Sequence, residues 1–116
     1  MTAIVTAFTL TAVLRLLPAP ALVAVMADGA DMTPQQAACI VRAESGWDTL
    51  AVGALGERGL WQIHPETWAF AREHMGADTD FALAFDAGEN TRTAVWLIAI
   101  GYGAWWASWV QCGGGA

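Results

Sequence analysis

The side chain best placed for acid–base chemistry in this sequence is Glu44, at the end of a predicted apolar helix. A repeat of three and four positions puts Glu44 on the same helical stripe as Ala37, Ile40 and Val41. Desolvation on that stripe and the negative end of the helix dipole both raise the pKa of a carboxyl group there. A raised pKa suits a general acid that works near neutral pH. By position alone, an outward-facing Glu at a helix end is an equally good interpretation.

A specific run of residues follows Glu44 and favours the catalytic interpretation. Ser45 comes next, and the sequence GLWQI occupies residues 59–63, with Gln62 eighteen positions after Glu44. This pattern resembles the lysozyme superfamily, most closely the soluble lytic transglycosylases and related phage wall-cleaving domains. Their signature is Glu-Ser followed by a Gly-Leu-Met-Gln-Ile-like run. The resemblance extends over residues 21–112, weakly at its edges.

The resemblance implies an activity and a role for each residue of the signature. In that family the Glu protonates the glycosidic oxygen between N-acetylmuramic acid and N-acetylglucosamine in peptidoglycan, so Glu44 would be the general acid and base. Among the implied substrate-binding residues, Gln62 would face the cleft. Ser45 would hold local backbone groups or simply be a polar helix end. Trp61, where the family often has Met, would be either a sugar platform or a core residue. The resemblance implies no cofactor.

Two departures from the family pattern concern the rest of the cleft. The family usually has Ser nine positions after the Glu, where this chain has Gly53, and an Ala-Tyr-Asn-Ala-Gly motif that this chain lacks. The segments FDAGENTRTA and GYGAWWASW instead resemble the Asp-Pro-Ala-x-Asn and Gly-x-x-x-Trp ending of phage and actinobacterial lysozyme-like domains. On that resemblance we assign Asn90, Tyr102 and Trp105 to substrate binding.

Glu57 bears on the type of cleavage. It stands two positions before Gly59, where animal-type lysozymes carry their second carboxylate ahead of a similar run. Two carboxylates across a sugar ring permit hydrolysis; with Glu44 alone, the 6-hydroxyl of the substrate can close an anhydro ring. Glu57 could instead pair with Arg58 at the surface, and Asp48 is a weaker candidate for the second acid. The gapless signature favours the anhydro-forming, transglycosylase type, and Glu57 would be catalytic in the hydrolytic alternative.

Helix signals place these residues in a small, mainly α, lysozyme-like (α+β) domain. Thr33-Pro34-Gln35-Gln36 is a capping box with Pro at the first helical position, and it predicts a helix that stops at Gly46. A second helix is predicted from Pro65 to Met75, and a capping box at residues 86–89 starts a third, through Ile100. Residues 48–63 are predicted to form a loop with a short irregular β-hairpin, its last strand being 59–63.

Residues 1–20 are apolar and are predicted to form an N-terminal helix outside the catalytic domain, which would span 21–116. The run reaches the length of a membrane span, about 20 residues, only by crossing Arg15, Pro18 and Pro20. It also lacks the positive start of a secretory signal. A signal-anchor, a helix docked on a virion or tail protein, and an extra core helix all remain open. We favour an anchor or docking helix, and so an extracytoplasmic protein that is virion-associated or membrane-anchored.

Composition excludes other classes of function. The 116 residues suffice for one domain, and they carry no lysine and a formal net charge of −6, which argues against binding to nucleic acid. Seven tryptophans are available for the core or for stacking on sugar rings. His64 and His74 lie ten positions apart and do not match the spacing that places two ligands on one helix face, so we predict no metal site.

The two cysteines, Cys39 and Cys112, are far apart in sequence and form no Cys-x-x-Cys motif. They suit a disulfide in an oxidising compartment, which would tie the C-terminal tail to the helix that ends at Glu44. Two buried thiols are the alternative.

The sequence as a whole is interpreted first as a small peptidoglycan-cleaving muramidase, associated with a phage and used for local wall degradation. A structural or glycan-binding virion component that has lost catalysis is the alternative from another class. A holin-like membrane-active protein would explain residues 1–20 but nothing in residues 44–68.

Overall fold

The structure is a computed structural model that describes residues 16–115. The predicted anchor or docking segment therefore lies outside the described residues, except for its last five positions. The described part contains these elements: α2 (Ala19–Ala27), η1 (Asp28–Ala30), α3 (Pro34–Ser45), α4 (Pro65–His74), η2 (Phe81–Phe85), α5 (Ala87–Ala99) and η3 (Gly103–Trp105), where η marks a 3-10 helix.

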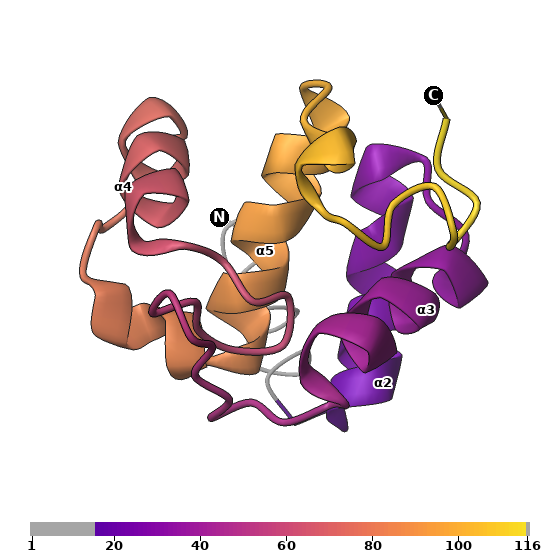
Figure 1. Ribbon diagram of the computed structural model, residues 1–116, viewed down its shortest axis with the longest axis horizontal. Helices are drawn as coiled ribbons and strands as arrows, with labels where there is room; N and C mark the ends of the chain where they lie inside the picture. The colour runs from indigo at the N-terminus through magenta and orange to yellow at the C-terminus, as the bar shows by residue number, and fades with distance from the viewer. Residues whose placement is uncertain (1–15, 116) are drawn as a thin grey trace, which may run out of the picture.

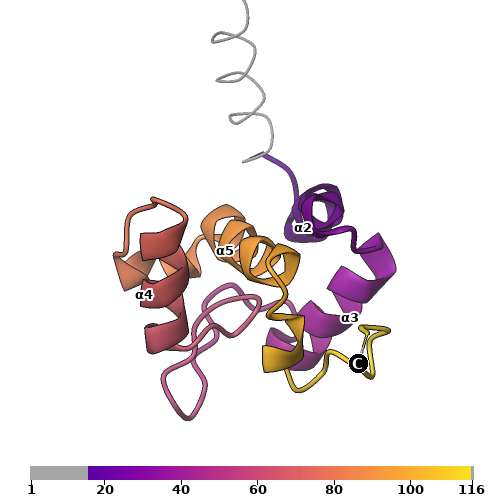
Figure 2. The ribbon, with the colours of Figure 1, turned by 90° about the horizontal axis from the view of Figure 1, so that it is seen from above.

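Helix α5 occupies the middle of the molecule (Figure 1). Helix α2 packs against both α3 and α5, and α4 packs against α5. Seen from above, α4 and α3 lie on opposite sides of α5, and the segment that joins α3 to α4 is drawn below α5 in this view (Figure 2). This arrangement of helices confirms the predicted mainly-α, lysozyme-like fold class.

Helix α3 begins and ends as its sequence predicts. The Thr33 hydroxyl accepts from the backbone N–H of Gln36 at 3.1 Å, and the Gln36 side chain accepts from the backbone N–H of Thr33 at 3.0 Å. Gly46 ends the helix in the left-handed conformation, at φ 61°, which glycine adopts without steric cost. Both ends are therefore stabilised locally, and Glu44 is held in the last turn of the helix.

The prolines near the start of the described chain begin a helix instead of only interrupting one. Pro18 is the N-cap of α2, and Pro20 lies in its first turn, where no N–H partner is lost. Leu22, Val23 and Ala27 of this helix are buried. Residues 19 and 20 form the start of α2. Within residues 16–115, no helix has the length and apolarity needed to cross a membrane.

The predicted strand at 59–63 is wrong. Between α3 and α4 the structure has two isolated antiparallel bridges, which pair Val52 with Arg58 and Arg58 with Ile63. Residues 59–62 form a tight turn, in which the N–H of Gln62 donates to the carbonyl of Gly59 at 3.1 Å. A turn at this point pulls the backbone out of an extended conformation, so no ladder can continue. The segment between α4 and α5 contains η2.

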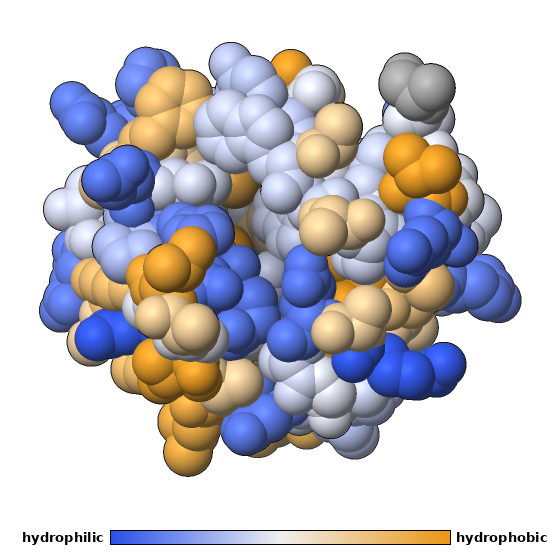
Figure 3. Space-filling model, viewed as in Figure 1, coloured by the Kyte–Doolittle hydropathy of each residue, from blue (hydrophilic) through white to orange (hydrophobic). Residues whose placement is uncertain are grey.

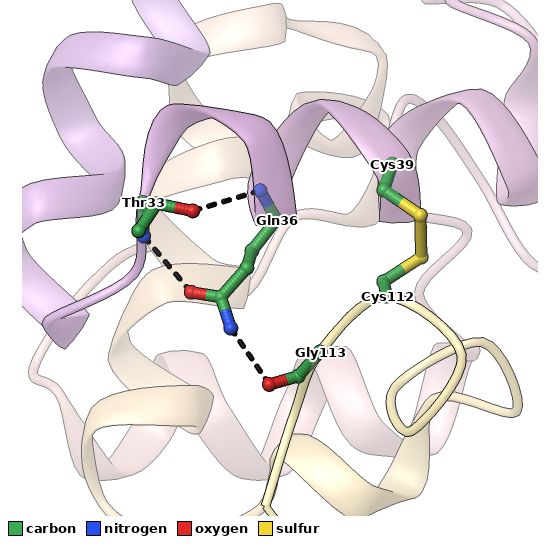
Figure 4. The surroundings of a disulfide bond; sticks show 5 residues. All are labelled: Thr33, Gln36, Cys39, Cys112 and Gly113. Atoms are coloured by element: carbon green, nitrogen blue, oxygen red, sulfur yellow. Dashed lines mark hydrogen bonds between the residues drawn. A yellow bond between two sulfur atoms is a disulfide. The ribbon is translucent and has the colours of Figure 1, made fainter.

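The predicted disulfide is present between Cys39 and Cys112, whose Cα atoms are 5.6 Å apart (Figure 4). Beside it, the side-chain amide of Gln36 donates to the carbonyl of Gly113 at 2.8 Å. The indole N–H of Trp109 donates to the carbonyl of Gly115, also at 2.8 Å. The glycine-rich tail is thus bound to the N-terminal half of α3.

Candidate active site

A cleft of about 220 Å³ lies between the end of α3, the connecting segment, the start of α4 and the residues after η3. Figure 3 shows that this face of the molecule is hollowed between the part containing α4 and the part containing α3. The following residues line the cleft: Glu44, Glu57, Gln62, Ile63, His64, Thr67, Trp105, Trp106 and Ala107.

Glu44 enters the cleft from the last turn of α3 and is half-buried. Burial raises the pKa of its carboxyl group, and the negative charge of Glu57 raises it further. The predicted direction of the shift is confirmed. Both effects favour the protonated form of Glu44 more than in a free glutamate, and the protonated form is the one that can donate a proton to a leaving group.

Glu57 lines the same cleft, but its pKa is shifted in the opposite direction. The N–H of its own backbone lowers the pKa of its carboxyl group; burial opposes this, while the N–H of Leu55 and nearby His64 lower the pKa further. The Leu55 N–H donates to Oε1 of Glu57 at 2.7 Å. The pKa of Glu57 is thus lowered, while that of Glu44 in the same cleft is raised.

The alternative partner for Glu57, Arg58, is engaged elsewhere. The Arg58 guanidinium lies over the rings of Phe81 and Phe85, 4.3 Å and 4.8 Å from their centroids, and donates to the carbonyl of Phe81 at 3.2 Å. In the described part of the chain, ion pairs join Glu89 to Arg72 and Arg92 only. The structure therefore contradicts the alternative of a surface ion pair between Glu57 and Arg58. The Glu57 side chain lines the cleft instead. Asp48 does not line it; its carboxylate accepts from the N–H of Leu50.

Gln62 reaches the cleft from a strained backbone. Its φ of 49° is in the left-handed region, which residues with a Cβ seldom adopt and which is common at functional sites. Its side-chain NH₂ donates to the carbonyls of Ala51 and Gly59 at 3.1 and 3.0 Å. With both donors directed at the loop, the carbonyl oxygen of the Gln62 side chain is left as an acceptor on the cleft wall.

Trp61 is a core residue, so its assignment as a sugar platform is contradicted. Its side chain is 0% exposed, and its indole N–H donates to the Thr91 hydroxyl at 3.1 Å. A buried indole has no face available to a substrate. Trp106 packs edge-on against it, with ring centroids 6.0 Å apart, and donates its indole N–H to the Trp61 carbonyl at 2.7 Å.

Asn90 is also buried and is not a substrate contact. Its side-chain NH₂ donates to the carbonyls of Arg58 and Ala84 at 3.0 and 2.9 Å, and its oxygen accepts from the N–H of Trp61 at 2.9 Å. Asn90 therefore fixes the turn before Gln62 from beneath. Gly59 completes this contact: it has a φ of 81°, and a Cβ there would collide with Asn90 and with the carbonyl of Ala84.

Ser45 does not line the cleft. Its hydroxyl donates to the carbonyl of Val41 at 3.1 Å, one turn back in α3. The position of Ser45 therefore does not support its assignment to substrate binding. Its hydroxyl instead satisfies a backbone carbonyl at the helix end.

Two aromatic residues of the C-terminal segment, Tyr102 and Trp105, were assigned to substrate binding. Trp105 is 55% exposed on the rim of the cleft, and Tyr102 stacks on it with ring centroids 4.3 Å apart. Phe70 of α4 contacts both rings. Only Trp105 of the two assigned residues lines the cleft, and Tyr102 holds it in place.

Trp106, His64 and Thr67 line the cleft and were not identified from the sequence. His64 directly precedes Pro65, which was predicted to start a helix, and Thr67 lies in the first turn of that helix. Their position at a helix start just after the GLWQI run was the sequence signal that could have identified them. Nothing in the local sequence distinguishes Trp106 from Trp105, because which of two adjacent tryptophans is buried depends on the packing of distant segments.

A helical fold whose cleft is lined by two carboxyl groups, one with a raised and one with a lowered pKa, is typical of lysozyme-like, glycan-cleaving proteins. Over residues 22–113 the chain matches the family model described as the Transglycosylase SLT domain. The chain therefore belongs to the transglycosylase SLT family, whose members cleave peptidoglycan. Comparison with curated proteins and with solved structures gives no match. The protein is thus a peptidoglycan-cleaving enzyme, and its substrate places its action outside the cytoplasm.

Proposed function

We propose that the protein cuts the glycan strand between N-acetylmuramic acid and N-acetylglucosamine, with Glu44 as general acid and then general base. One observation supports this most strongly: a half-buried carboxyl group with a raised pKa opens into the cleft of a transglycosylase-family domain. A carboxyl group that retains its proton near neutral pH can protonate the glycosidic oxygen as the bond to C1 of the muramyl residue breaks.

The family route then uses Glu44 a second time. Having given up its proton, the Glu44 carboxylate takes a proton from the 6-hydroxyl of the same muramyl residue. The 6-oxygen bonds to C1 and closes the 1,6-anhydro ring, and Glu44 is protonated again. The products are a glycan end with a free hydroxyl on N-acetylglucosamine and an anhydromuramic end, and no water is consumed.

Two further residues are proposed to bind the glycan. The exposed indole of Trp105 offers a flat apolar face for a sugar ring, at low entropic cost because Tyr102 and Phe70 already hold it. The side-chain oxygen of Gln62 is placed to accept a hydrogen bond from a sugar hydroxyl or an acetamido N–H.

The first prediction is that Glu44→Gln abolishes lysis of purified peptidoglycan without unfolding the protein, since it removes the proton and little volume. General acid catalysis is worth about 10²–10⁴-fold in rate, and we expect a loss in this range in turbidity and zymogram assays. Glu73→Gln, an exposed acid on α4, is the control. A loss below about tenfold, with circular dichroism unchanged, would refute the role of Glu44.

The placement of the enzyme on a phage virion or a membrane is also a proposal, supported by the sequence of residues 1–20 and by the phage-like C-terminal pattern. Fractionation of the full chain, expressed with its phage or host, tests it. Recovery in neither the virion nor the membrane fraction would refute it.

A further inference from the structure

Gly53 lies directly against the two polar side chains of one cleft wall. A Cβ added at Gly53 would lie 2.7 Å from Oε2 of Glu57 and 2.8 Å from the side-chain oxygen of Gln62. Carbon and oxygen atoms that are not bonded do not approach so closely without one of them moving. Any side chain at position 53 would therefore displace the Glu57 carboxylate from the place it occupies. The serine usual in the family at this position would do the same.

The backbone around Gly53 also fixes the direction of Glu57. The N–H of Gly53 donates to the backbone carbonyl of Glu57 at 2.8 Å, and the N–H of Leu55 donates to Oε1 of the side chain at 2.7 Å. With Oε1 bound to the loop, Oε2 is the oxygen that faces Gly53 and Gln62. The loop thus holds the carboxylate at both its backbone and its side chain, on the wall of the cleft that contains Glu44.

Two carboxyl groups of one cleft whose surroundings move their pKa values apart can serve as an acid and a base. The charge of Glu57 is close enough to act on Glu44, and both side chains face the same space of about 220 Å³. Two carboxyl groups facing one sugar ring are the arrangement that hydrolytic glycosidases use.

We propose that Glu57 is a second catalytic carboxylate, which activates a water molecule and gives this site a hydrolytic activity beside the anhydro-forming one. The inference rests on the proposed role of Glu44, which remains the acid in both reactions. Gly53 is a positioning residue, because its missing side chain leaves room for the Glu57 carboxylate.

The hydrolytic step balances without any further reactant. Glu44 donates its proton to the glycosidic oxygen, and the bond between that oxygen and C1 of the muramyl residue breaks. Glu57 takes a proton from water as the water oxygen bonds to C1. The products are a free hydroxyl on N-acetylglucosamine and a reducing muramic end. Glu57 then releases its proton and Glu44 regains one from solvent.

The second prediction concerns the ratio of reducing to anhydro muramic ends, measured by mass spectrometry of digested peptidoglycan in heavy-oxygen water. The wild type should form both ends, with heavy oxygen in the reducing ones. Glu57→Gln should lower this ratio about tenfold or more, as expected for loss of a general base, while anhydro ends are still formed. Gly53→Ser keeps both carboxyl groups and should lower the ratio in the same direction by displacing Glu57. Glu73→Gln should leave it unchanged.

The outcomes separate this inference from the proposed function. A wild type that forms anhydro ends alone, or a ratio unchanged in Glu57→Gln, would overturn the inference and leave Glu44 as the acid. Full activity in Glu44→Gln would overturn the proposed function instead. Should Glu57→Gln fail to fold by circular dichroism, Gly53→Ser decides, since an unchanged ratio in that variant overturns the inference. A wild type with reducing ends only, inactivated by Glu57→Gln, would support catalysis by Glu57 and refute the anhydro route.

Discussion

Glu44 and Glu57 are the same residue type in the same cleft, yet their surroundings move their pKa values in opposite directions. Glu44 is half-buried and lies near the charge of Glu57, so its pKa is raised. Glu57 is bound by backbone N–H groups of the loop, so its pKa is lowered. The negative charge of Glu57 is one of the reasons why the pKa of Glu44 is raised.

The third prediction concerns the pH dependence of total glycan cleavage. Glu44 must be protonated, so activity should fall as pH rises through its raised pKa. Glu57→Gln removes a negative charge and therefore lowers the pKa of Glu44, although burial still holds it above its ordinary value. The alkaline limb of the rate profile should shift to lower pH in this variant. An alkaline limb at the wild-type position would show that Glu57 does not act on Glu44.

Helices α4 and α5 are joined by a buried arginine. Arg72 of α4 is 1% exposed; it donates to Glu89 at 2.8 Å and to the Thr93 hydroxyl at 3.2 Å, both on α5, and its Nε donates to the carbonyl of Asp78 at 2.7 Å. Glu89 also lies within 3.3 Å of exposed Arg92. This network explains a difference from the sequence prediction. Asp86 caps α5 by accepting from the N–H of Glu89, but the Glu89 carboxylate binds Arg72 instead of completing the capping box.

The fourth prediction is that Glu89→Gln destabilises the protein by about 3 kcal/mol at neutral pH, because it leaves a buried guanidinium without its counter-charge. Burial would raise the pKa of Glu89, but the hydrogen bonds and charges of Arg72 and Arg92 lower it overall. A lowered folded pKa means that the stabilisation exists above the pKa of the unfolded chain and is lost as pH falls through the folded value. Urea unfolding at neutral and acidic pH measures this.

The difference between wild type and Glu89→Gln should therefore shrink in acid, where Glu89 is protonated in both states. Glu73→Gln again serves as the matched control, with no large change at either pH. A destabilisation by Glu89→Gln that stayed constant down to low pH would assign the effect to packing and not to charge.

A disulfide bond links two distant parts of the chain. The disulfide joins residues 73 positions apart and holds the tail against α3, the helix that ends with Glu44. Between α5 and Cys112 lies the segment with Trp105 and Trp106, which forms one side of the cleft. The disulfide therefore anchors both the tail and the far end of a cleft-forming segment to the helix that carries Glu44.

The fifth prediction is that replacing both Cys39 and Cys112 by Ser lowers the free energy of unfolding by about 2–4 kcal/mol, because a long loop in the unfolded chain is released. Urea unfolding with and without a reductant measures this. The reductant should bring the wild type to the stability of the double variant and leave the double variant unchanged. An equal effect of the reductant on both proteins would contradict the prediction.

Features that depend on residues close in sequence were predictable. The Thr33 capping box, Gly46 as helix end, and the place of Glu44 on the apolar stripe all follow from local spacing, since a helix sets which neighbours lie three or four positions away. The disulfide was also predictable, because each of the two cysteines in this sequence has no other cysteine to pair with. The helical fold class was implied by the signature, which the family match supports.

Features that depend on contacts between distant segments could not be predicted in this way. Trp61 and Trp105 have similar local sequences, but only packing against Thr91 and Trp106 shows that Trp61 is buried. Asn90 resembles a cleft residue until its three bonds to backbone groups of other segments are seen. Whether Glu57 pairs with Arg58 or faces Glu44 depends on Phe81 and Phe85, more than twenty positions away, because their rings bind the guanidinium. Rules based on local sequence do not include such contacts, because burial and charge pairing depend on which distant segments the fold brings together.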